Sequence, residues 1–74
     1  MRYAIVMTRT NGSCRAHVPD LSGCVAQVAT LSGVQREIAE AIRQHIEAME
    51  RSGRPAPPPA TLACYVEAWR DRAG

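Results

Sequence analysis

Only one stretch of this chain, from about Leu31 to Arg51, has the periodicity of an amphipathic helix. At 100° per residue, its apolar side chains fall on one side and its charged side chains on the other. A single helix can cover only one face of a β-sheet. A chain of 74 residues with one helix therefore has to build the rest of its core from strands, and it leaves one face of the sheet for a partner.

The ends of this helix carry recognisable signals. It can begin after Thr30, or after Ser32 with Gln35 completing a capping box. Gly53 suits a left-handed C-cap, and Pro55 prevents the helix from continuing. The predicted apolar face comprises Leu31, Val34, Ile38, Ala41, Ile42, His45, Ile46 and Met49, and the predicted polar face comprises Arg36, Glu40, Arg43, Glu47 and Arg51.

The residues before the helix have the composition of three strands. The run from Arg2 to Arg9 is β-branched and aromatic, and the Asn11-Gly12 pair supplies the positive φ angles of a tight hairpin turn. The chain then returns antiparallel over residues 14–19, turns again at 19–23, and forms a third strand over 24–29. Because the first strand is apolar on both sides, we expect it to be buried on both faces.

After the helix, residues 54–60 are rich in proline and predict an extended, semi-rigid connector. Residues 61–69 alternate in the manner of a strand, and residues 70–74 form a polar tail that we expect to fray. The predicted fold class is α+β, with the order β-β-β-α-β in a single domain over residues 1–74. It consists of a three-stranded antiparallel meander, one helix on one face and a final strand.

Composition excludes several function classes. Nine basic residues against seven acidic ones give a formal charge of +2, a weak field for binding phosphates. Three cysteines with no secretory signal before them favour the reducing cytoplasm over a disulfide-bonded fold. The closest pair of metal-ligand type, Cys14 and His17, is too sparse for a zinc site, so we expect no metal and no cofactor. No apolar run is long enough to span a membrane.

Four segments together resemble the HicB family of antitoxins. They are Met1-Arg2-Tyr3-Ala4-Ile5-Val6, Val18-Pro19-Asp20-Leu21-Ser22-Gly23-Cys24, Ala41-Ile42-Arg43-Gln44-His45-Ile46-Glu47 and Gly53-Arg54-Pro55-Ala56-Pro57-Pro58-Pro59. The resemblance implies a partial RNase H-like fold in which the last strand lies parallel to the first. It also implies a partner, a small RNA-cleaving toxin of the HicA type that the antitoxin covers.

The resemblance leaves the function open between three hypotheses. The first is a non-catalytic antitoxin that neutralises such a toxin by protein–protein contact, and the others are a stand-alone homo-oligomeric domain with another partner and a weak RNA binder. Catalysis of the RNase H kind needs a cluster of carboxylates for two metal ions, whereas Asp20 is the only acid before Glu37. We therefore expect no enzymatic activity. Longer family members usually carry a DNA-binding segment after this domain, so we expect no sequence-specific DNA binding from this chain alone.

Two sets of residues are candidates for contacts. Arg15 and His17 share the outer face of the second strand, and with Asp20 in the following turn they are the predicted partner-binding residues. The predicted interface of a dimer or tetramer comprises Ile5, Met7, Tyr65 and Trp69, because the first strand is apolar on both sides and exposed aromatic pairs often anchor interfaces. His45, on the apolar helix face, is predicted to be a hydrogen-bonded histidine of the core or of an interface.

Overall fold

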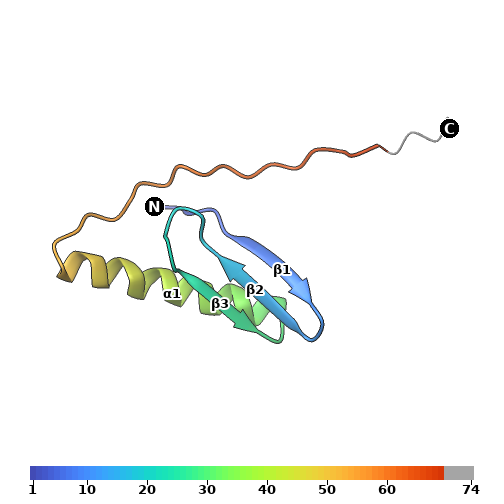
Figure 1. The fold of residues 1–74 in the computed structure, drawn as a ribbon, viewed down its shortest axis with the longest axis horizontal. Helices are drawn as coiled ribbons and strands as arrows, with labels where there is room; N and C mark the ends of the chain where they lie inside the picture. Colours follow the sequence, from blue (N-terminus) through green and yellow to red (C-terminus); the bar gives the residue numbers. More distant parts are fainter. Residues whose placement is uncertain (70–74) are drawn as a thin grey trace.

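The computed structural model describes residues 1–69. Strands β1 (Val6–Thr10), β2 (Ser13–His17) and β3 (Val25–Val28) form an antiparallel sheet in the order β1-β2-β3. Helix α1 (Leu31–Arg51) lies across one face of this sheet, so the body has two layers (Figure 1). The predicted α+β class, the antiparallel meander and the helix that follows it are confirmed.

The first hairpin turns where the sequence predicts it. Asn11 and Gly12 separate Thr10 from Ser13, which face each other across the pair, and Gly12 has a φ of +72°. β1 is shorter than expected, because it begins at Val6 rather than at Arg2. The preceding Tyr3 and Ile5 still pack against the core without belonging to a strand.

Helix α1 has the predicted bounds, and its capping identifies Thr30 rather than Ser32 as the N-cap. The Thr30 hydroxyl accepts a hydrogen bond from the Gly33 N–H at 3.0 Å. At the other end, the N–H of Gly53 donates to the Glu50 carbonyl at 3.1 Å and that of Arg54 donates to the Met49 carbonyl at 2.9 Å. With Gly53 at a φ of +76°, this is a Schellman motif.

The core lies between the sheet and the first half of α1. Val34 and Ile38 are the buried helix residues, and they meet inward-facing side chains of β2 and the turn that follows it. Ala41 and Ile42 pack against this cluster, whereas His45, Ile46 and Met49 are half-buried farther along. A helix of 21 residues is about 31 Å long and a five-residue strand about 17 Å, so α1 extends beyond the sheet. The buried cluster consists of Cys14, Ala16, Val18, Leu21, Cys24, Val34 and Ile38.

Helix α1 is not centred on the sheet. Its backbone lies close to β2 and β3 but not to β1. All five residues of β1 are consequently exposed, Val6 by 42% and Met7 by 38%. Within the single chain the first strand is therefore left uncovered, because the one helix covers the other two strands. Its expected burial by a second copy or by another protein stays a prediction.

The segment after the connector also differs from its prediction. Residues 61–69 are extended but form no strand with any other described residue. They leave the body as an arm (Figure 1), and we call residues 61–69 the C-terminal arm. The radius of gyration is 15.8 Å, whereas a compact chain of this length would have about 11 Å. The predicted tail, residues 70–74, lies outside the described residues.

Candidate functional site

The face of the sheet opposite α1 is covered by no other described element and carries two of the predicted partner-binding residues. Cys14 and Ala16 of β2 point into the core, so Arg15 and His17 point outward, where both are exposed. The strand register places His17 between Val6 and Val25, and Arg15 between Thr8 and Gln27. We call these six residues the outer face.

The outer face combines an apolar row with a polar row. Val6 is 42% exposed and Val25 is 49% exposed, and they flank the imidazole of His17. Arg15 has the polar residues Thr8 and Gln27 as its neighbours across the two strand pairs, and the Gln27 amide donates to the Ser13 hydroxyl at 3.3 Å. Exposed apolar side chains beside an arginine are typical of surfaces that bind another protein.

Asp20, the third predicted partner-binding residue, is engaged within the chain. Its carboxylate accepts hydrogen bonds from the N–H groups of Ala60 and Thr61, at 2.9 and 3.0 Å, and from the Thr61 hydroxyl at 2.8 Å. The Thr61 N–H, then the Ala60 N–H, lower the pKa of Asp20 below its ordinary value of 3.8 because they stabilise the charged form. We call this set of hydrogen bonds the Asp20 clamp. It fixes the root of the C-terminal arm.

The candidate interface residues lie at the N-terminal strand and on the arm, and the structure does not bring the two groups together. Ile5 is half-buried and packs against the core, whereas Met7 is 38% exposed on the uncovered strand β1. On the C-terminal arm, Tyr65 is fully exposed and Trp69 is 88% exposed. Sequence reasoning placed all four on strands, but only Met7 lies within one.

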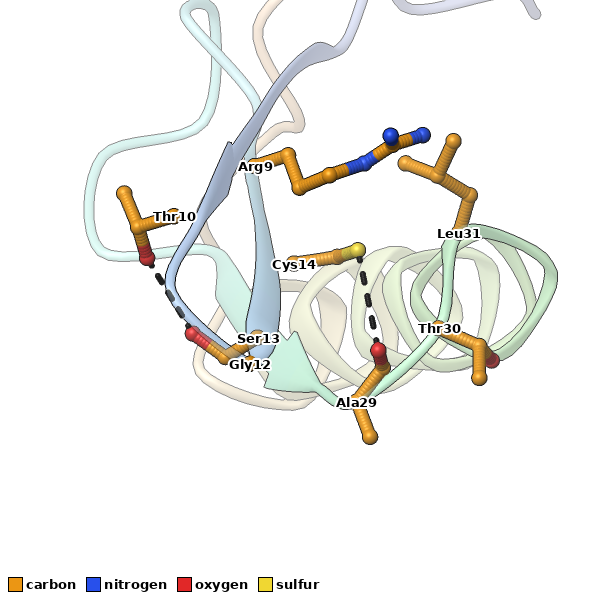
Figure 2. A pocket seen from close by; sticks show the side chains of 8 residues that line it. All are labelled: Arg9, Thr10, Gly12, Ser13, Cys14, Ala29, Thr30 and Leu31. Atoms are coloured by element: carbon orange, nitrogen blue, oxygen red, sulfur yellow. Dashed lines mark hydrogen bonds between the residues drawn. The ribbon is translucent and has the colours of Figure 1, made fainter.

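A small cavity lies between the β1–β2 hairpin and the start of α1. It has a volume of about 290 Å³ and is lined by residues of both elements. The Cys14 thiol lies in it with its sulfur 3.9 Å from the Ala29 carbonyl oxygen, and the Arg9 side chain extends toward Leu31 (Figure 2). Arg9 therefore lies on the helix side of the sheet, away from Arg15.

His45 lines a different cavity, near the C-terminal half of α1. This cavity has a volume of about 390 Å³ and includes Asp20, Met49 and Pro57 in its lining. The imidazole is half-buried, so the structure places it beside the proline connector and the turn at residue 20. The predicted role, a hydrogen-bonded histidine of the core or of an interface, stays a prediction.

Two further shifts of pKa within the described residues come from an exposed ion-pair group and from the burial of a thiol. Arg43 pairs with Glu40 and Glu47 on the exposed helix face, and its hydrogen bond to Glu40 lowers the pKa of that carboxyl. The Cys24 thiol is buried, and burial raises its pKa, which disfavours the reactive thiolate. Within residues 1–69, no three His, Cys, Asp or Glu side chains gather closely enough to hold a metal ion. Helix α1 lacks the apolar character that crossing a membrane requires.

The comparison with protein families gives a match over nearly the whole chain. The model of the HicB-like antitoxin of bacterial toxin-antitoxin systems matches residues 3–72. The chain belongs to the HicB-like antitoxin family. Comparisons with curated proteins and with solved structures found no match for it.

The family match includes the C-terminal arm of this HicB-like chain as well as its body. The arm therefore lies within the matched range, although only its first residues contact the body. The clamp explains how the arm is attached: Asp20 is a turn residue 40 residues before Ala60, and sequence spacing gave no signal for that contact.

Sequence reasoning also missed Val6 and Val25 as members of the outer face of this HicB-like domain. The alternation of side chains along β3 predicts the outward position of Val25. If Ala26 and Val28 face the core, Val25 and Gln27 must face outward, because successive strand residues point to opposite sides. The exposure of Val6 follows from the off-centre helix, which no local pattern predicts.

Proposed function

We propose that this HicB-like chain binds a small RNA-cleaving toxin of the HicA type and neutralises it by covering its surface, without catalysis. Membership of an antitoxin family supports a role in a toxin-antitoxin system. The observation that carries the proposal is the outer face, where Arg15 and His17 stand among exposed valines with no cover from the described chain.

The composition of the outer face favours a protein partner over RNA. A surface for RNA would gather several arginines along one groove or stripe. Arg15 lies on the outer face, whereas Arg9 lies on the helix side of the sheet (Figure 2). The two arginines cannot act on the same phosphate backbone segment from opposite faces, so direct RNA binding is the weaker alternative.

Two finer features belong to the same proposal. The C-terminal arm forms the final strand of a partial RNase H-like sheet by pairing in parallel with a β1 strand, and the chain acts as a homo-oligomer. The open edge of β1 and the alternating apolar residues of the arm support this pairing. Three free cysteines support a cytoplasmic location.

The test is growth rescue in a bacterial host that expresses a HicA-type toxin from the same source. The unmodified chain should relieve toxicity and co-purify with the toxin in a fixed ratio. The double variant Arg15→Glu/His17→Glu should fold but bind the toxin at least about tenfold more weakly, because both side chains are exposed and interface arginines often contribute strongly.

A matched control carries the same change of charge on a different surface. The variant Gln35→Glu/Arg36→Glu alters two exposed residues of α1 and should retain full rescue. If the unmodified chain neither binds the toxin nor relieves its toxicity, the antitoxin proposal is wrong and the stand-alone oligomeric domain takes its place. Equal weakening by both double variants would reject the outer face as the contact surface.

A further inference from the structure

Four large apolar side chains of the C-terminal arm are almost completely exposed. Leu62 is 94% exposed, Val66 is 85% exposed and Trp69 is 88% exposed, while Tyr65 is fully exposed. The backbone of the arm is extended and takes part in no sheet. Such a segment offers both side chains and unpaired backbone groups to another strand.

The same chain has an edge that could receive the arm. β1 is the first strand of the sheet, so one of its two edges has no neighbour. The arm begins close to this edge, because Thr61, Leu62 and Ala63 line one cavity together with residues 2–4. The clamp at Asp20 and the hydrogen bond from the Tyr3 hydroxyl to the Pro57 carbonyl fix this crossing point. Beyond it, the arm diverges from its own β1 (Figure 1).

We infer that the C-terminal arm pairs in parallel with β1 of a second copy of this chain, while the arm of that copy pairs with β1 of the first. The inference rests on the strand pairing proposed above and does not depend on the toxin. In one molecule the arm has no partner strand and the outer edge of β1 has no neighbour. In a dimer with a twofold axis, each arm pairs with the β1 edge of the other copy.

The alternation of the arm fits the edge of β1 in one register. Met7 faces the helix side of the sheet, because it lies opposite the buried Ala16, and Tyr3 and Ile5 also pack against the core. A strand that continues the alignment of residues 61–63 beside 2–4 brings Leu62 and Val66 to this apolar side. A shift by one residue would reverse every side chain and bring Tyr65 and Trp69 to this side instead. The position of residues 61–63 beside residues 2–4 therefore sets the register.

The exchanged surface approaches the size that a stable dimer needs. In the inferred register Tyr65 and Trp69 lie on the outer side of the sheet beside Val6 and Thr10, where the neighbouring strand covers part of each ring, so each contributes less than the roughly 150–250 Å² of a fully buried aromatic side chain. Leu62 and Val66 on the apolar side, together with the surface that receives both arms, bring the total to the order of 1,000 Å², the lower range of specific interfaces. The stiff proline connector keeps the arm extended, which favours exchange over folding back.

Disulfide trapping tests the exchange directly. In a Cys64→Ser background, which removes the one exposed thiol, the variant Thr8→Cys/Glu67→Cys places two thiols on neighbouring strands in the inferred register. Strands lie about 4.8 Å apart, within the range that a disulfide spans. We expect mild oxidation to give a covalent dimer on a non-reducing gel.

The matched control is Gln27→Cys/Glu67→Cys in the same background. Gln27 lies in the same cross-strand row as Thr8 but on β3, about 14 Å from an arm paired with β1. A dimer that forms equally with this pair would overturn the inference. An oxidised monomer from Thr8→Cys/Glu67→Cys would show pairing without exchange, and no disulfide at all would reject the pairing itself.

Sedimentation equilibrium gives an independent measurement on the natural cysteine set. The variant Val66→Asp should raise the dimer dissociation constant at least tenfold while the circular dichroism of the helix stays unchanged. Val25→Asp makes the same change at an exposed valine of β3 and should leave the constant unaltered. A monomeric unmodified chain at micromolar concentration, or equal effects of the two variants, would overturn the exchange.

Discussion

At the scale of single residues, Asp20 holds the root of the arm. Its carboxylate joins the turn after β2 to Ala60 and Thr61, 40 and 41 residues later. A carboxylate that accepts two N–H groups and a hydroxyl is well suited to stay charged. The clamp therefore positions the arm without any contribution from the apolar core.

The variant Asp20→Asn tests this role. An amide has one acceptor oxygen in place of two and no charge, so it cannot satisfy all three donors. We expect the amide hydrogens of Ala60 and Thr61 to exchange about tenfold faster in this variant, with the exchange of β2 amides unchanged. Glu37→Gln on the exposed helix face is the control and should leave the exchange of the Ala60 and Thr61 amides unchanged. Unchanged exchange at both positions in Asp20→Asn would refute the clamp.

The same contact predicts a dependence on pH. The pKa of Asp20 is lowered in the folded chain, so the clamp is fully present above the ordinary value of 3.8 and is lost as the pH falls through the lowered value. The Thr61 amide resonance should follow this loss on acidification from neutral pH. Its inflection should lie below 3.8, and an inflection at a higher pH would contradict the hydrogen-bonded geometry.

At the scale of elements, the end of α1 depends on one backbone conformation. Gly53 has a φ of +76° and its N–H closes the Schellman motif on Glu50. The variant Gly53→Ala should lower the free energy of unfolding by about 1 kcal/mol, because side chains with a Cβ disfavour this region. Urea unfolding measures the change. Gly53→Asn is the control and should cost less, since asparagine tolerates the left-handed region better.

The elements also show what a local pattern can predict. The helix bounds, the Asn11-Gly12 turn and the inward side of β2 follow from periodicities and turn preferences over a few residues. The start of β1 and the state of residues 61–69 could not be predicted in this way, because a strand exists only where another strand pairs with it. Alternation shows that the arm can pair, but the identity of its neighbour is a property of the whole fold or of an assembly.

The same distinction applies to the candidate site. Arg15 and His17 were predicted to face outward, since residues on either side of the buried Ala16 must point away from the core, and the structure places them there. Asp20 was recognised as a turn residue, but its hydrogen bonds to Ala60 and Thr61 depend on the path of the proline connector. Contacts between residues so far apart in the chain produce no recognisable spacing pattern in the sequence.

At the scale of the whole molecule, stability rests on a core of few residues. Ile38 is 1% exposed, and Ile38→Ala should cost about 2–5 kcal/mol through lost transfer energy and the cavity left behind. A domain of this size has only a few kcal/mol of net stability, so we expect this variant to be largely unfolded at 37 °C.

The control for this variant is Ile46→Ala, the same truncation at a half-buried position of α1 outside the core cluster. It should cost less than half as much, because partly exposed side chains lose less apolar burial. Thermal unfolding followed by circular dichroism measures both variants. Similar losses would mean that the second half of the helix is packed as tightly as the first.

The core cluster and the residues packed against it include no described residue after Ile42. Folding of the body and recognition by the arm therefore draw on separate parts of the sequence. Substitutions in residues 62–69 should therefore carry little penalty in the stability of the body, whereas Thr61 belongs to the Asp20 clamp. Under the inferred exchange, two variants of this chain that differ in their arms and in the edges that receive them would sort into separate assemblies while keeping identical cores.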